Sequence, residues 1–112
     1  MLSHRVKRRY LAVKAESKEP IQGKEVLDAV WNTLTQLFGE YGASQSELTF
    51  IQDYKQKGYF ILRCSRRALP KVKASIASIR EICEKPVTIH VLRVSGTLEA
   101  LRKKTASAKL TQ

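Results

Sequence analysis

Residues 47–65 read ELTFIQDYKQKGYFILRCS and contain two segments with strand character on either side of a short turn. Apolar, aromatic and β-branched residues dominate 47–54 and 59–65, and the polar turn 55–58 ends at Gly58. This pattern predicts an antiparallel β-hairpin. Segments of helical periodicity precede and follow it, so the hairpin is expected to form the middle of a mixed α+β domain rather than part of an all-β one.

The flanking segments complete the order of elements. Alternating residues predict strands over 9–15 and 87–94, and apolar residues three and four apart predict helices over 24–41 and from 68 or 69 to 83. The order βαββαβ is typical of the ferredoxin-like (RRM-like) sandwich, a four-stranded antiparallel sheet with two helices on one face. We expect one such domain over 1–112, with a basic N-terminal arm (1–8) and a short basic C-terminal helix and tail (97–112).

Alternation also predicts the two faces of the sheet. The side chains expected to face the helices from the first and third strands are Leu11, Val13, Phe60, Leu62 and Cys64. The opposite face would then carry Tyr10, Tyr59 and Arg63, on which single-stranded bases can stack while the cation meets a phosphate. Lys57-Gly58-Tyr59 begins like the RRM signature of this strand, but the residues after it depart from the signature.

The last strand makes the second face partly apolar. Leu92 and Val94 are predicted to point away from the two helices, and a free surface does not favour such residues. Either the terminal helix folds back over them through Leu98 and Leu101, or another protein covers them.

Trp31 and the two cysteines give further expectations. Trp31 follows the apolar stripe of the first helix and is predicted to be buried against the sheet. Cys64 and Cys83 form no CxxC pair and are predicted to be reduced core residues. The sequence contains no signal peptide or apolar run long enough to span a bilayer, so we expect an intracellular, cytoplasmic protein.

Charge indicates the class of partner. The net charge is +11, and no Asp or Glu occurs between Tyr54 and Arg80. A need for solubility alone would be met by a mixture of positive and negative residues. Binding to a membrane surface requires helices with a basic face opposite exposed aromatic residues, and the predicted helices lack this pattern. A polyanion is therefore the expected partner. The cations expected to bind RNA are Arg5, Lys7, Arg8, Arg9, Lys57, Arg63, Arg66, Arg67, Lys71, Lys73, Arg93, Arg102 and Lys103.

An enzyme active site has little support in the sequence. His4 and His90 are the only histidines, and no pair of carboxylates or Cys-His arrangement has the spacing of a nucleophilic or metal site. Glu16 is the single acid at the end of the first strand, and one carboxylate makes a poor divalent-cation site. We therefore expect no catalytic residue and no metal or cofactor bound by this chain.

The turn Ser95-Gly96-Thr97 connects the last strand to the terminal helix. Thr97 is predicted to cap that helix, and Gly96 allows a tight turn. The amides of Gly96, Thr97 and Leu98 can receive an RNA phosphate or a partner carboxylate, or they can form an ordinary cap without a ligand. Candidate contacts with a protein partner are Leu92, Val94, Gly96 and Thr97.

Four short motifs, in the same order along nearly the whole chain, resemble one family. They are KRRYL at residues 7–11, YGA at 41–43, LRC at 62–64 and HVLRVSGT at 90–97. The chain resembles the small RRM-like ribonuclease P proteins shared by archaea and eukaryotes, called protein component 2 in archaea. The short terminal segment after Gly96-Thr97 is similar to the archaeal members rather than to the tailed eukaryotic ones.

The resemblance implies a non-catalytic subunit of ribonuclease P. Its partners would be the ribonuclease P RNA, precursor tRNA and the larger TIM-barrel-like protein subunit, in an arrangement compatible with a heterotetramer. The RNA would remove the 5′ leader from precursor tRNA with magnesium, and this chain would stabilise the RNA. A free-standing RNA-binding or ribosomal protein of the same fold is the alternative, and the long segment without acids argues against a small-molecule sensor.

Overall fold

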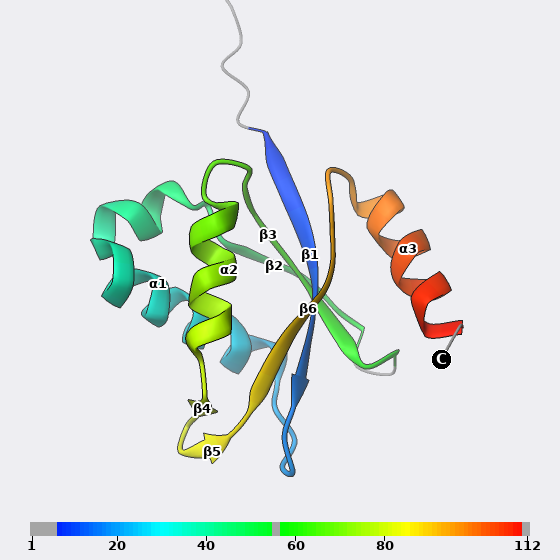
Figure 1. Cartoon of the computed structure of the whole chain (residues 1–112), viewed down its shortest axis with the longest axis horizontal. Helices are drawn as coiled ribbons and strands as arrows, with labels where there is room; N and C mark the ends of the chain where they lie inside the picture. The colour runs from blue at the N-terminus through cyan, green and yellow to red at the C-terminus, as the bar shows by residue number, and fades with distance from the viewer. Residues whose placement is uncertain (1–6, 55–56, 111–112) are drawn as a thin grey trace, which may run out of the picture.

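The computed structural model describes residues 7–54 and 57–110, and it shows the predicted order of elements (Figure 1). Each main strand or helix of the prediction is present, and a small hairpin of two short strands follows α2. The elements are β1 Arg8–Glu16, α1 Gly23–Gln45, β2 Thr49–Tyr54, β3 Tyr59–Ser65, α2 Leu69–Ser78, β4 Glu81–Ile82, β5 Lys85–Pro86, β6 Thr88–Ser95 and α3 Leu98–Leu110. None of the helices in this part of the chain is long and apolar enough to cross a membrane.

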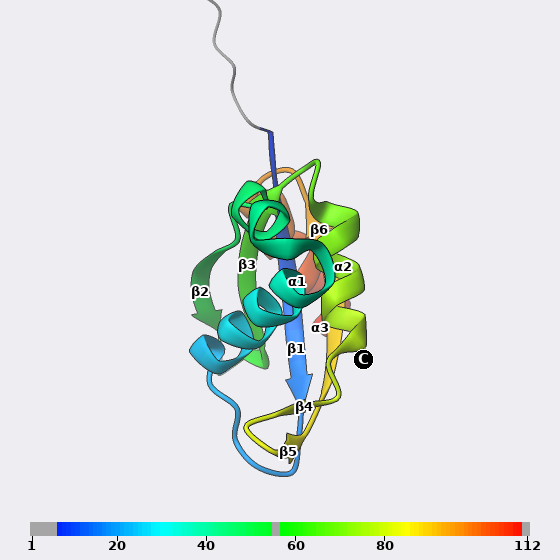
Figure 2. The ribbon, with the colours of Figure 1, turned by 90° about the vertical axis from the view of Figure 1, so that its left-hand side faces the viewer.

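The sheet has the ferredoxin-like strand order β2-β3-β1-β6, with all three strand pairs antiparallel. β1 and β3 are central, and their register runs from Arg8 opposite Ser65 to Val13 opposite Phe60. Helices α1 and α2 cover one face of the sheet and α3 lies on the other (Figures 1 and 2). The predicted α+β sandwich is therefore confirmed.

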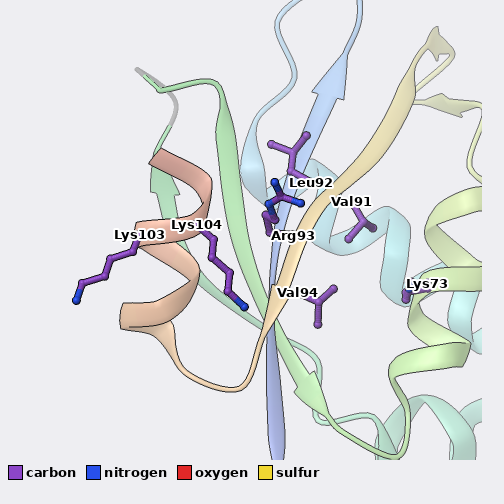
Figure 3. A pocket seen from close by; sticks show the side chains of 7 residues that line it. All are labelled: Lys73, Val91, Leu92, Arg93, Val94, Lys103 and Lys104. Atoms are coloured by element: carbon purple, nitrogen blue, oxygen red, sulfur yellow. The ribbon is translucent and has the colours of Figure 1, made fainter. Parts of the chain in front are cut away.

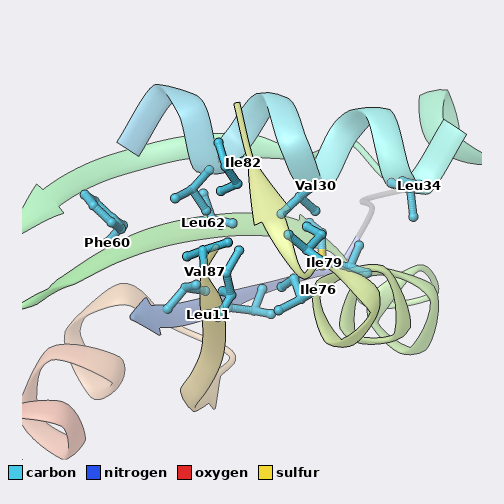
Figure 4. Packing of buried hydrophobic residues seen from close by; sticks show 14 of the residues in the cluster. Leu11, Val30, Leu34, Phe60, Leu62, Ile76, Ile79, Ile82 and Val87 are labelled. Atoms are coloured by element: carbon cyan, nitrogen blue, oxygen red, sulfur yellow. The ribbon is translucent and has the colours of Figure 1, made fainter. Parts of the chain in front are cut away.

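The larger core fills the space between the sheet and the helices α1 and α2 (Figure 4). Leu11 and Val13 of β1 meet Leu62 and Cys64 of β3 here, and all four are fully buried. The predicted inward faces of both central strands are correct. Burying a side chain of this size contributes roughly 1.5–3 kcal/mol, so this layer is the main source of stability.

The prediction that Trp31 is buried is wrong, because its side chain is 40% exposed. The buried stripe of α1 consists of Val26, Val30 and Leu34, four residues apart. One further residue along a helix turns the side chain by about 100°, so Trp31 points to the flank of α1 and not to the sheet.

Helix α1 continues to Gln45, beyond the predicted end near Tyr41, because Gly39 introduces a kink rather than a stop. Gly39 has φ 79° and ψ 167°, a backbone conformation that residues with a side chain rarely adopt. Leu37, Phe38 and Tyr41, on either side of this kink, are exposed and do not belong to the main core.

A second, smaller cluster lies between the sheet and α3. Leu101 of α3 is fully buried against Ala12 of β1 and Ile61 of β3, and Tyr59 is only 2% exposed. The terminal helix therefore covers the sheet itself, as one of the two alternatives predicted. The other expectation for this face is wrong: Tyr59 is covered by protein and offers no ring to a nucleic-acid base.

A β-bulge changes the predicted orientation of the last strand. Ala12 pairs with Arg93 and Val13 with Val91, so Leu92 is an extra residue in β6. Leu92 packs in the cluster under α3, whereas Val94 packs with the larger core. The expectation that both point to the same face is wrong, because the inserted residue shifts the alternation by one position.

Helix α2 ends earlier than predicted, at Ser78. Arg80 to Val87 form a turn with the short strands β4 and β5, and Cys83 lies in it with φ 52°. Cys83 is therefore exposed rather than buried in a helix, and only Cys64 is the core residue expected. Ile79 and Ile82 do reach the core, which explains why the apolar period seems to continue past Ser78.

Replacing Leu101 by Ala tests the docking of α3. Leu101 is fully buried, so we expect the free energy of unfolding in urea to fall by about 2–5 kcal/mol. The matched control is Leu37→Ala on α1, where the leucine is 52% exposed and the change should stay within about 0.5 kcal/mol. Equal effects of the two substitutions would contradict the packing of α3 on the sheet.

The two thiols should differ in reactivity. Burial raises the pKa of Cys64 to about 11, so at pH 8 this group is protonated as well as inaccessible, whereas Cys83 is exposed. Titration of the native protein with a thiol reagent should modify Cys83 alone, and both cysteines should react in denaturant. Cys83→Ser should abolish the native reaction, and persistent labelling of that variant would show that Cys64 is accessible.

Candidate nucleic-acid interface

One end of the sheet gathers cations from the start of β1 and the end of β3. The antiparallel register places Arg8 opposite Ser65, and the Arg66 amide donates a hydrogen bond to the Lys7 carbonyl at 2.7 Å. We call this group the basic end, and it consists of Lys7, Arg8, Arg9, Arg66 and Arg67. The pairing of β1 with β3 therefore brings together two segments that are distant in the sequence (Figure 1).

The five cations of the basic end are not equally available. A guanidinium nitrogen of Arg8 lies 3.3 Å from Glu47 Oε1 in an ion pair, and an Nη1 proton of Arg9 is donated to the Arg8 carbonyl at 2.9 Å. Arg66 and Arg67 are exposed, and their side chains make no ion pair with any residue in the described ranges. These two side chains are therefore free to bind a phosphate without first breaking an existing contact.

The turn after β6 lies beside the same end. A Cβ atom placed on Gly96 would be 3.5 Å from Arg9 Nη1, so the turn and this guanidinium are neighbours. Thr97 caps α3 as predicted, because its Oγ1 accepts a hydrogen bond from the Ala100 amide at 3.2 Å. The Thr97 amide donates a hydrogen bond to Ser95 Oγ at 3.4 Å. One of the three amides proposed to bind an anion therefore already has an acceptor within the protein.

A second basic surface is a groove along β6 with a volume of about 770 Å³ (Figure 3). It runs between α2 and α3, and its lining residues are Lys73, Val91, Leu92, Arg93, Val94, Lys103 and Lys104. We call it the β6 groove. No acidic residue lines it, and it brings together three predicted RNA-binding cations and two predicted partner contacts. Lys104 is missing from both sets of candidates, although the run from Arg102 to Lys104 marks it as a cation of the same helix.

The remaining candidates lie apart from these two surfaces. At the far end of β3, Lys57 and Arg102 stand over the ring of Tyr54 at 5.8 and 5.6 Å, and Arg102 also donates to Gln52 at 2.9 Å. Burial raises the pKa of the neighbouring Tyr59, an effect increased by Tyr54 and opposed by Arg102. Arg102 is thus held by the packing of α3 on the sheet, whereas Lys57 reaches the same ring from the turn before β3.

Three further candidates have their own environments. Lys71, in the first turn of α2, lies 5.5 Å from the ring centroid of Phe38. Arg63 is partly buried beside Tyr10, and its Nε is buried without a hydrogen-bond partner. Arg5 lies outside the residues that the structure describes.

No group of three or more His, Cys, Asp or Glu residues with the geometry of a metal site occurs within 7–54 and 57–110. His90 Nε2 lies 3.1 Å from Glu16 Oε1 on the exposed ends of β6 and β1. This is an exposed contact, and Lys14 Nζ lies 4.0 Å from the same Glu16 oxygen.

The geometry defines a basic RRM-like protein whose sheet is covered on both faces and which groups cations at one end of the sheet and along one edge. The chain belongs to the Rpp14/Pop5 family, whose model matches residues 9–106. Its relatives include Ribonuclease P protein component 2 of Methanocaldococcus jannaschii, 37% identical over 89% of this chain and 73% of the relative. The protein of the same name from Pyrococcus furiosus is 31% identical over 89% of this chain and 83% of the relative.

The fold recurs in a solved complex. A chain in the cryo-EM structure of yeast ribonuclease MRP superposes with a TM-score of 0.64 and 15% identity, covering 98% of this chain and 97% of that one. At this identity the similarity concerns the fold. It shows that the sandwich with its terminal helix occurs in a protein of similar length.

Proposed function

We propose that this chain is a non-catalytic protein subunit of ribonuclease P that binds and stabilises the RNA responsible for removing the 5′ leader of precursor tRNA. Its family and the names of its relatives support this role. The structural observation that carries the proposal is the basic end, where exposed cations from two distant segments are held together by the pairing of β1 and β3.

The basic end is suited to the RNA backbone rather than to bases. Arg66 and Arg67 are free cations in the turn between β3 and α2, and a guanidinium can bind a phosphate through two parallel hydrogen bonds. The covered sheet offers no exposed ring of Tyr59 for stacking. Such an arrangement positions a folded RNA without reading its sequence.

The rest of the proposal follows the family. Catalysis would come from the RNA with magnesium, and the chain would assemble in the cytoplasm with that RNA, precursor tRNA and a larger TIM-barrel-like protein subunit. Capture of the tagged full chain from native lysate should recover the ribonuclease P RNA together with this second protein. Recovery of ribosomal RNA alone would favour a free-standing RNA-binding protein instead.

The purified chain should not cleave precursor tRNA. No group of three or more His, Cys, Asp or Glu residues within 7–54 and 57–110 could hold a metal ion, and the proposal assigns the reaction to the RNA. Incubation of labelled precursor tRNA with the protein and magnesium should leave the 5′ leader intact, and adding the ribonuclease P RNA with its other protein subunits should restore cleavage. Cleavage at the mature 5′ end by the protein alone would contradict the proposal.

Replacing Arg66 and Arg67 by Ala should weaken binding to the ribonuclease P RNA. Each lost phosphate contact should reduce the slope of log K against log salt by about one unit, because fewer counterions are released. Filter binding over a range of potassium chloride concentrations measures this slope.

The control removes the same charge elsewhere. Lys18 follows β1 at its opposite end, Lys24 lies in the first turn of α1, and both are exposed. Their double replacement by Ala should leave the slope close to that of the unmodified chain. Equal slopes for the two double variants would place the RNA site outside the basic end.

A further inference from the structure

The outer edge of β6 is free to pair with another strand. β6 is the terminal strand in the order β2-β3-β1-β6, and β1 is its single partner within the part of the chain that the structure describes. It is eight residues long, Thr88–Ser95, and alternate backbone N–H and C=O groups along its outer edge therefore point away from the sheet. Such an edge is a template for an added strand.

The layers on either side define the surroundings of an added strand. Continuation of the sheet beyond β6 runs between α2 and α3, which is where the β6 groove lies (Figure 3). Side chains of a strand alternate between the two faces of its sheet, so those of an added strand would point in turn toward Lys73 of α2 and toward Lys104 of α3.

The charges of the groove favour carboxylates. Lys73, Arg93 and Lys104 are exposed and make no ion pair with another described residue, whereas the Lys103 ammonium lies 3.5 Å from Glu99 Oε1 and points away from the groove (Figure 3). The bulge at Leu92 brings Arg93 to the side of α3, so that side carries two free cations and the side of α2 carries one.

The floor of the groove favours a polypeptide over RNA. Val91, Leu92 and Val94 are only partly buried, and no aromatic ring lines the groove on which a base could stack. A strand added next to β6 would form main-chain hydrogen bonds with the unpaired backbone groups of β6. It would also gain apolar contacts with the aliphatic side chains beside them.

We propose that the β6 groove binds an extended acidic segment of a protein partner, which adds as a fifth strand to the sheet next to β6. Carboxylates on one side of the segment meet Arg93 and Lys104, and those on the other meet Lys73. Apolar residues between them cover Val91, Leu92 and Val94. This protein site is separate from the basic end and goes beyond the RNA-binding role.

The test uses a fluorescein-labelled synthetic peptide in which pairs of Glu alternate with pairs of Val, so that each face of the added strand carries both carboxylates and apolar side chains, together with the unmodified full chain. Anisotropy gives the affinity, and hydrogen exchange measured by NMR shows which amides become protected. We expect binding together with slower exchange of amides along β6. A peptide of the same sequence with alternate backbone amides N-methylated keeps its charge but loses donors, and it should bind at least tenfold more weakly.

Paired variants separate the groove from general charge attraction. Lys73→Ala with Lys104→Ala should weaken peptide binding by about three- to tenfold, as expected for the loss of two partly exposed ion pairs. Arg66→Ala with Arg67→Ala removes the same charge at the basic end and should change it less than twofold. The salt dependence of RNA binding should fall in the Arg66→Ala/Arg67→Ala variant and change little in the Lys73→Ala/Lys104→Ala variant. The two proposed roles can therefore fail independently of each other.

Three results would overturn the proposal. Equal binding of the N-methylated peptide would show attraction without strand pairing. Equal loss of affinity in both double variants would show that net charge alone holds the peptide. Protection of the β6 amides by oligouridylate but not by the peptide would assign the groove to RNA instead.

Discussion

The antiparallel pairing of β1 with β3 is the contact on which the rest of the structure depends. Leu11 and Leu62 turn one face of this pair toward α1 and α2, while Ala12 and Ile61 turn the other toward α3. Both strands are thus buried on two sides, which explains their runs of apolar residues. The same register brings Lys7 next to Arg66. One set of backbone hydrogen bonds therefore sets both cores and the arrangement of cations at the end of the sheet.

Covering the sheet with α3 changes how an RRM-like fold can meet RNA. In this chain the faces of the sheet are used for packing, so the parts of the sheet left for partners are the strand ends and the strand edge. The strand ends present arginines suited to phosphates. The edge presents a groove with unpaired backbone, aliphatic residues and lysines. The two surfaces differ in chemistry, and the two proposed roles assign them to different kinds of macromolecule.

Local patterns predicted most of the fold, and the errors occur where contacts between distant segments decide the outcome. The bounds of β3, Tyr59–Ser65, were predicted correctly because strand residues and a turn with glycine coincide there. The bulge at Leu92 depends on the register between β1 and β6, which alternation within one strand does not contain. Trp31 fits an apolar pattern, but the helix buries the stripe Val26, Val30 and Leu34, and Trp31 is offset from that stripe by one residue. For the site, the register of β1 and β3 made the basic end predictable, whereas the β6 groove requires the placement of α3.

The ion pair between Arg8 and Glu47 gives the basic end an internal competitor. Glu47 is held in the turn before β2 with φ 52°, and its carboxylate already neutralises one guanidinium of the cluster. A phosphate that reaches Arg8 must displace this carboxylate, so binding there exchanges one anion for another. Arg66 and Arg67 begin with a solvent counterion instead. Cations of equal charge on the same surface therefore contribute unequally, and the difference is set by which of them already have an anion in the free protein.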